Sequence, residues 1–540
     1  MSTSTLSKLL VVMVLLSACQ APKQQESFQL GQLNHQFKIN KSAQEPFERG
    51  LLLLHSFEYD DAREAFIEAR TNDPSELMAY WGEAMSHYKA LWGLQNEDSG
   101  KAVIQRAGMT QDNRYKLASG PLELDFWKGI EILYGEGSLD ARNQAYADHM
   151  ADLYERYPDN QEVAAFYALA LMWTESDGRT QEASGLSAQI AKGILEENPL
   201  HPGALHYLIH ANDDPDYAAL SIAAANEYAD VAPDATHALH MPSHIYLAMG
   251  MWNEMVHSNE NSYAASVNRM ERKGLGDEAR GYHSYAWLHY GYLQQGRFDK
   301  AEKLLRDMHH YVNSVPVRYT RRYLISMQNA QLVESGQWIE GLEPMIVNIE
   351  DLSLTSQAGQ LFFQSMLAYE KGDSISIAAH TDSLENKIAA AELIVIEKTI
   401  SVCGTGPTRY APDKSDILRA QVMVNQMNAF ISILAKDTEL TELYLMAATN
   451  LEEEAEYSYG PPDIPYPSFE QYGEWLLTQD RPKEALEMFE KSLAVAKNRT
   501  RALDGKINAL NLLGQPAAID SVRMIIKEFW VGIDSTDVTI

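Results

Sequence analysis

The chain has 540 residues, too many for one simple hydrophobic core, so it contains several domains or an extended array of small units. Its 75 Asp and Glu outnumber its 44 Lys and Arg, which gives a formal net charge of −31. This balance argues against a nucleic-acid partner, because such binding depends mainly on Lys and Arg at phosphates. Two cysteines exclude a disulfide framework of more than one bridge.

The N-terminal residues predict a secretory signal. After Lys8 the chain continues LLVVMVLLSAC, an apolar run that is too short to span a bilayer and ends in small residues. Residues 16–19 resemble the lipobox of bacterial lipoproteins. This resemblance implies cleavage before Cys19, attachment of palmitate and other lipid there, and a membrane anchor. Gln20, in place of Asp, favours the outer membrane of a diderm bacterium. An ordinary signal peptide with a chance cysteine is the alternative.

Residues 1–18 are therefore expected to be a lipoprotein signal peptide. Residues 19–44 are polar and show almost no apolar period, so we expect a lipidated, flexible tether there. From about Glu45 apolar residues recur at spacings of three and four, which predicts helices.

The first helical segment is FERGLLLLHSFEYDDAREAFIEARTNDP. Small residues lie where two helices must approach, at Gly50, Ala62 and Ala69. Phe66 completes the pattern of the second helix, and Pro74 follows that helix. This spacing resembles the tetratricopeptide repeat (TPR) family. The resemblance implies an all-α solenoid of stacked helix hairpins, whose concave face usually binds a partner.

Two later segments keep the same phase. They contain Gly296 with Ala301 and Gly473 with Phe489, and weaker units are expected at residues 331–345 and 365–378. We predict a TPR solenoid over residues 45–400, a loop over residues 401–416, and C-terminal TPR repeats over residues 417–540. Cys403 lies in that loop, where an inert thiol is a simpler interpretation than a reactive or metal-binding one. The Gly- and Pro-rich segment of residues 457–467 predicts a rigid connector.

Histidines are concentrated between His201 and residue 289. Pro199 and Pro233 are one 34-residue repeat apart, so helices are expected to begin near Pro202 and Thr236. Counted from these starts, and from Tyr282 for the next unit, six histidines occupy the second, fifth or ninth place of a unit, which in the TPR family face the groove. They are His206, His210, His237, His240, His244 and His283.

Histidines four residues apart on a helix have Cβ atoms about 5–6 Å apart and can bind one ion. A transition metal such as zinc or copper would suit imidazole ligands. Peptide-binding or structural histidines, and acid–base chemistry without metal, are the alternatives. The acidic residues 213–216 could supply a ligand or a partner to a ligating histidine, or form a solvated turn. Tyr207 replaces the general-base Glu of H-E-x-x-H, which argues against that protease chemistry.

Pro242 lies between His240 and His244. Because a proline restricts the preceding residue, Met241 is expected to leave the α region and the helix to start near Pro242. His237 and His240 would then lie on the loop that enters the helix.

The sequence favours a membrane-anchored TPR scaffold that binds a protein or peptide partner. The alternative is a metal-binding protein or metal-dependent hydrolase that uses the groove histidines. A carbohydrate-binding lipoprotein of the SusD type is less favoured, because the aromatic-rich, loop-heavy middle of that class is missing. The segments HYLIH and HMPSHIY, with Gly460-Pro461-Pro462, also resemble a group of long bacterial TPR proteins, and that resemblance implies no reaction.

Overall fold

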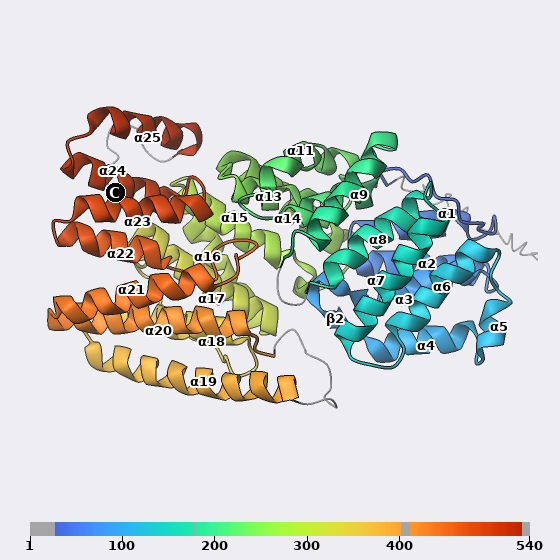
Figure 1. Cartoon of the computed structure of the whole chain (residues 1–540), viewed down its shortest axis with the longest axis horizontal. Coiled ribbons are helices and arrows are strands. Elements are labelled where there is room, and N and C mark those ends of the chain that lie inside the picture. Colours follow the sequence, from blue (N-terminus) through green and yellow to red (C-terminus); the bar gives the residue numbers. More distant parts are fainter. Residues whose placement is uncertain (1–27, 176–178, 401–410, 532–540) are drawn as a thin grey trace, which may run out of the picture.

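The computed structural model describes residues 28–175, 179–400 and 411–531, and it is built of antiparallel helices stacked side by side (Figure 1). The strands in these residues are β1 (Tyr88–Lys89) and β2 (Leu94–Gln95), which pair as one antiparallel ribbon. Consecutive helices pack against each other, and alternate helices also touch, as in a solenoid of hairpins. The expected all-α TPR-type solenoid is confirmed.

The first half of the solenoid runs from the N-terminal helices to the long helix α14. Its helices are α1 (Gln44–His55), α2 (Tyr59–Asn72), α3 (Leu77–Met85), η1 (Ala90–Trp92), α4 (Glu97–Ala107), α5 (Gln111–Tyr115), α6 (Pro121–Leu133), α7 (Leu139–Arg156), α8 (Gln161–Trp173), α9 (Ala183–Glu197), α10 (Pro202–Ala211), η2 (Ala218–Ser221), α11 (Ile222–Val231), α12 (Thr236–His240), α13 (Pro242–Ala248) and α14 (Trp252–Lys273).

The second half forms the other lobe in Figure 1. Its helices are η3 (Asp277–Ala279), α15 (Tyr282–Gln294), α16 (Phe298–Ser314), α17 (Arg318–Ser335), α18 (Leu354–Glu370), α19 (Ser374–Ile400), α20 (Lys414–Ala435), α21 (Thr438–Glu454), α22 (Ser468–Thr478), α23 (Pro482–Val495), α24 (Thr500–Leu512) and α25 (Pro516–Phe529).

The glycines of the repeat pattern allow the two helices of a hairpin to approach. A Cβ atom on Gly50 in α1 would lie 2.9 Å from the ring of Phe66 in α2. A Cβ atom on Gly473 in α22 would lie equally close, 2.9 Å, to the ring of Phe489 in α23. Two distant hairpins therefore use the same contact of a glycine with an aromatic ring, as the spacing predicted.

The prediction of a weak repeat unit at residues 331–345 is wrong. Helix α17 ends at Gly336, whose φ of 70° is left-handed, and no helix forms before α18. The segment between them is held by side chains: Gln328 bonds the main chain of Met345, and Gln360 bonds both main-chain groups of Val347. The weak unit at residues 365–378 is a true hairpin, of α18 and α19.

The described part of the predicted tether, residues 28–44, packs against the folded chain. Leu30 and Phe37 are buried in the core of the first half. The backbone N–H of Gln32 donates to the carbonyl of Leu200, and that of Lys38 donates to the carboxylate of Glu123. Two apolar side chains spaced seven residues apart thus fix residues 28–43 to the surface. The predicted signal peptide, Cys19 and the rest of the tether lie outside the described residues, as does Cys403.

The C-terminal hairpins return to the middle of the chain. The indole N–H of Trp252 donates to the carbonyl of Asn498, and the hydroxyl of Thr500 donates to the carbonyl of Gln294. Apolar side chains of α24 and α25 join the same core cluster as those of α13 to α15. The second half therefore closes on the middle of the chain.

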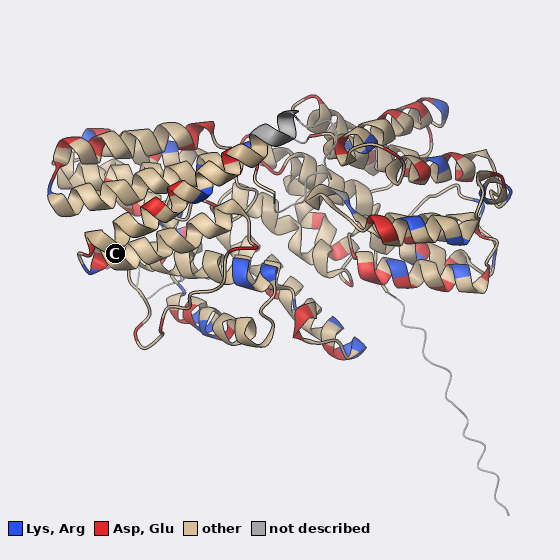
Figure 2. Cartoon of the chain, turned by 90° about the horizontal axis from the view of Figure 1, so that it is seen from below, with Lys and Arg blue, Asp and Glu red and all other residues tan. Residues whose placement is uncertain are grey.

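Charged residues are spread along the helices of both halves in the view of Figure 2. Among the described helices, none combines the length and the apolar composition that crossing a membrane requires.

Candidate functional site

Four inner helices bring the predicted histidines to the interior. Helix α10 begins at Pro202 and α12 at Thr236, the positions that the 34-residue phase predicted. Helix α15 begins at Tyr282, from which the next unit was counted, and α13, which carries His244, begins at Pro242 as expected. The expectation that this proline forces Met241 out of the α region is wrong.

Met241 has φ −53° and ψ −37°, which is α-helical. Its backbone N–H donates to the carbonyl of His237, and its side chain is fully buried, so packing and this hydrogen bond override the local preference. His237 and His240 consequently lie on the short helix α12 and not on a loop.

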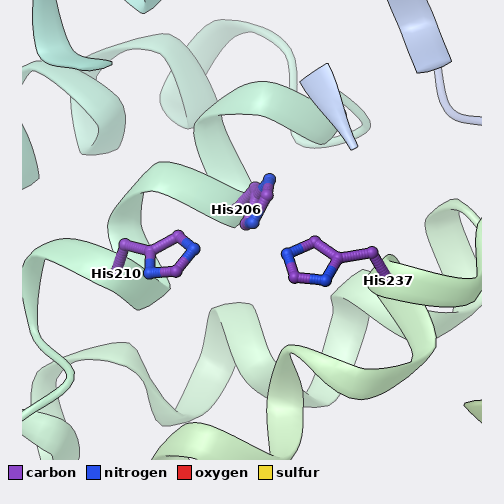
Figure 3. A group of neighbouring side chains, drawn as sticks. All are labelled: His206, His210 and His237. Atoms are coloured by element: carbon purple, nitrogen blue, oxygen red, sulfur yellow. The ribbon is translucent and has the colours of Figure 1, made fainter. Parts of the chain in front are cut away.

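The first triad consists of His206, His210 and His237, whose rings face a common space (Figure 3). One nitrogen from each ring lies within 4.8 Å of the other two. The Nδ1 atom of His206 lies 2.7 Å from the carbonyl oxygen of His55. Because a carbonyl only accepts, this Nδ1 carries the proton and Nε2 carries the lone pair. The Nε2 atoms of all three rings are shielded from solvent and have no hydrogen-bond partner among the described residues.

The second triad consists of His240, His244 and His283, again with one nitrogen from each within 4.8 Å of the others. His240 Nδ1 lies 2.7 Å from the side-chain oxygen of Asn259, whose amide nitrogen donates to another carbonyl. His244 Nδ1 lies 2.6 Å from a carboxylate oxygen of Asp213. Both Nδ1 atoms therefore donate, and in the neutral form of each ring Nε2 carries a lone pair. These two Nε2 atoms are only 3.2 Å apart.

The two triads adjoin each other. The ring centroids of His210 and His244 are 5.9 Å apart, and those of His237 and His240 are 6.1 Å apart. The structure therefore gathers all six predicted histidines into one cluster, which we call the histidine cluster.

Burial keeps much of the cluster uncharged. Removal from water, with a smaller contribution from the neighbouring histidines, lowers the pKa of His206 to about 3. Burial also lowers the pKa values of His210, His237 and His240 far below the ordinary value. A neutral imidazole is the form that binds metal ions.

Sequence reasoning missed several residues of the site. Asn259 lies on α14, and the carbonyl of His55 belongs to α1, 151 positions before its partner. Trp287 packs on both His240 and His244, with ring centroids 4.9 Å and 4.5 Å away. The acidic residues 213–216 divide between the two expected roles: Asp213 orients a histidine, while Asp214 caps a local turn.

A third group, His55, Glu162 and His201, is fully buried beside the first triad. His55 bonds both the hydroxyl of Tyr207 and the carboxylate of Glu162 at 2.8 Å. His201 Nδ1 accepts the backbone N–H of Ala204 at the start of α10. The group is thus engaged in internal contacts that join α1, α8 and α10. His289, which is not among the six predicted histidines, bonds Gln331 instead of the cluster.

A cavity of about 650 Å³ opens beside the histidine cluster, between the two halves of the chain. His210, His237, His244 and His283 form part of its wall. The opposite wall comes from α17, α18, the start of α20, and the predicted connector of residues 457–467. Apart from the histidines, the lining mixes aromatic rings with charges of both signs. It includes Trp92, Trp287, Tyr290, Tyr323, Tyr459, Arg179, Arg322, Arg419, Asp413, Asp416 and Glu456.

No protein-family model matches the chain, and no curated protein matches it in sequence. Solved structures resemble it at low identity. A human IFIT1 dimer with m7Gppp-AAAA is 13% identical with a TM-score of 0.36, over 91% of this chain and 95% of that one. Yeast Tom70 is 11% identical with a TM-score of 0.29, over 89% and 90%. The TPR domain of P58(IPK) is 11% identical with a TM-score of 0.22, over 88% and 99%. No ligand or partner of this chain follows from similarity at this level.

Proposed function

We propose that the chain is a membrane-anchored TPR scaffold that binds a protein or peptide partner in the cavity between its two halves. The observation that carries this proposal is the composition and size of that cavity. Its volume of about 650 Å³ lies within the range of about 300–1,000 Å³ that is typical of ligand sites. This volume suits a short segment or a chain terminus of a partner.

The walls of the cavity suit a peptide. Every residue of a peptide main chain presents hydrogen-bonding groups that need partners once they are buried. In the cavity wall the side-chain oxygen of Asn329 is shielded from solvent and accepts no hydrogen bond within the described chain. Its amide nitrogen donates to the carbonyls of Ile325 and Gly359, which fixes the oxygen as the available acceptor. A main-chain N–H of the partner would satisfy it.

The experiment is a selection of binders from a displayed library of random decapeptides. Enriched peptides are then measured by fluorescence anisotropy against the wild type, with EDTA present throughout. Ser326 is an exposed residue of α17 that lines the cavity, so Ser326→Trp should fill the cavity without disturbing the core. We expect it to weaken binding at least tenfold.

The matched control is Ser521→Trp on the exposed face of α25, which should bind as the wild type does. Enrichment of no peptide above background, or equal binding by Ser326→Trp and the wild type, would show that the cavity is not a peptide site.

The anchor is part of the same proposal. Lipid on Cys19 would hold the scaffold at the outer membrane of a diderm bacterium, at the end of a short linker before Phe28. Cys19→Ser should abolish labelling by radioactive palmitate and release the chain from the membrane fraction. Persistent labelling would exclude Cys19 as the lipidated residue.

A further inference from the structure

We propose that the histidine cluster binds two late transition-metal ions, such as zinc or copper, with one ion in each triad beside the cavity. This inference concerns sites that the peptide-scaffold proposal does not require.

Three ring nitrogens of the first triad lack a partner. The Nε2 atoms of His206, His210 and His237 are shielded from water and have no partner in the described structure. Buried polar atoms are unfavourable when unsatisfied, so three together in one place call for a shared partner. His206 Nε2 carries a lone pair because its Nδ1 donates to the His55 carbonyl, and a metal ion would accept this lone pair together with one from each of the other two rings.

The second triad brings two ring nitrogens face to face. His240 Nδ1 donates to Asn259 and His244 Nδ1 donates to Asp213, so in the neutral form of each ring Nε2 is an acceptor. At 3.2 Å apart two such lone pairs repel unless a proton on one of them or a metal ion lies between them. Nitrogen ligands at about 2.0–2.1 Å from a tetrahedral ion lie about 3.4 Å from each other, which is close to the observed separation.

The surroundings match those of known metal-binding histidines. A ligating histidine usually gives its second ring proton to a carbonyl, amide or carboxylate, which fixes the ring and raises its basicity. The carbonyl of His55 does this for His206, Asn259 for His240, and Asp213 for His244. A carbonyl, an amide or a carboxylate thus orients three of the six rings, and the hydroxyl of Tyr323, 3.0 Å from His283 Nδ1, contacts a fourth.

The donor set selects the class of metal. Imidazole nitrogens suit zinc, copper, nickel and iron, whereas magnesium and calcium require oxygen ligands. The contacts of His206 with the His55 carbonyl and of His240 with Asn259 place the ring protons of both on Nδ1, which leaves Nε2 available to a metal ion. In the group of His55, Glu162 and His201 both nitrogens of His55 and the Nδ1 of His201 are already bonded. Only His201 Nε2 and Glu162 Oε1, which lie 3.6 Å apart, lack a hydrogen bond in that group.

Three protein ligands leave one position of a tetrahedral ion for another donor. His210 and His237 of the first triad and His244 and His283 of the second line the cavity. The remaining position of each ion would therefore be reachable from the cavity.

The experiment measures bound zinc. The full chain, purified in detergent with a tag that contains no histidine, is incubated with Zn²⁺, dialysed, and analysed by inductively coupled plasma mass spectrometry. We expect two ions per chain for the wild type. His210→Ala and His283→Ala, which change residues only partly buried beside the cavity, should each retain about one ion. Co²⁺ loading, followed by visible absorption, reports the same sites independently.

The matched control is His257→Ala, an exposed residue on α14 outside both triads, which should retain both ions. Asp213→Asn tests a positioning residue: it should lower the affinity of the second triad about 10–100-fold and leave the first unchanged. Circular dichroism confirms that each variant is folded.

Absence of bound zinc and of cobalt absorption in the folded wild type would overturn the proposal. Equal metal content in wild type, His210→Ala and His283→Ala would also overturn it. The peptide measurements are made in EDTA and therefore test the peptide site without metal. A negative result for one proposal does not contradict the other.

Discussion

Arg499 should determine whether the C-terminal hairpins stay closed on the middle of the chain. Its guanidinium is fully buried and lies 2.6 Å from carboxylate oxygens of both Glu470 and Glu334. It also donates to the hydroxyl of Tyr290 at 2.6 Å. Glu334 belongs to α17, Tyr290 to α15 and Glu470 to α22, so one side chain ties three helices together.

Arg499→Met retains most of the volume but leaves two carboxylates without their cation. Breaking a buried ion pair from one side costs about 3–5 kcal/mol. The substitution therefore weakens the contact between α22–α25 and the middle repeats by this free energy. A loss of about 3 kcal/mol in opening free energy raises the exchange rate of protected amides roughly 150-fold.

Hydrogen exchange read by mass spectrometry measures this effect helix by helix. The amides of α22 to α25 should exchange at least a hundredfold faster in Arg499→Met, with smaller changes in α2 and α3. Arg523→Met, which removes an exposed arginine of α25, is the control and should change stability by less than about 0.5 kcal/mol.

A combined variant separates charge from packing. Arg499→Met with Glu470→Gln and Glu334→Gln removes all three ionisable groups, and we expect it to recover most of the lost stability. If the single variant exchanges like the wild type, or the combined variant is as unstable as the single one, the buried ion cluster does not hold the closure.

Two further predictions concern stability. Burial lowers the pKa of His289 to about 4. The neutral ring stabilises the fold above pH 6.5, and this contribution is lost as pH falls toward 4, because the unfolded chain then binds the extra proton. Between pH 7 and 5 the wild type should therefore lose about 2 kcal/mol that His289→Leu does not lose, measured by urea unfolding at both pH values. Gly505→Ala should destabilise by about 1–3 kcal/mol in the same assay, since its Cβ would lie 2.3 Å from the Phe489 ring. Gly193→Ala, with open space around its Cβ, should instead stabilise by up to about 1 kcal/mol.

The sequence predicted the parts of the structure that depend on short spacings. Pro199 and Pro233 set the repeat phase, and from it the starting residues of α10 and α12 were correct. The gathering of five of the six histidines followed from the same phase, and that of His283 from a unit counted from Tyr282. Met241 was predicted wrongly because its conformation is set by tertiary burial, which outweighs the preference of a residue before proline.

The remaining contacts join residues that no local pattern connects. His55 and His206 are 151 positions apart, and Arg499 meets Tyr290 across 209 positions. Such contacts depend on the curvature of the whole solenoid, to which every hairpin contributes a small rotation. The identity of the groups that orient the histidines was therefore not available from the sequence.

Closure of the second half and the histidine cluster are physically connected through Trp287. A Cβ atom on Gly460 would lie 2.6 Å from the Trp287 ring, so the connector of residues 457–467 packs directly on that side chain. Trp287 in turn packs on His240 and His244. The connector leads into α22, whose Glu470 binds Arg499. A shift of the C-terminal hairpins would therefore move the connector that packs over the second triad. The cavity and the cluster therefore depend on the same closure, although their proposed ligands differ.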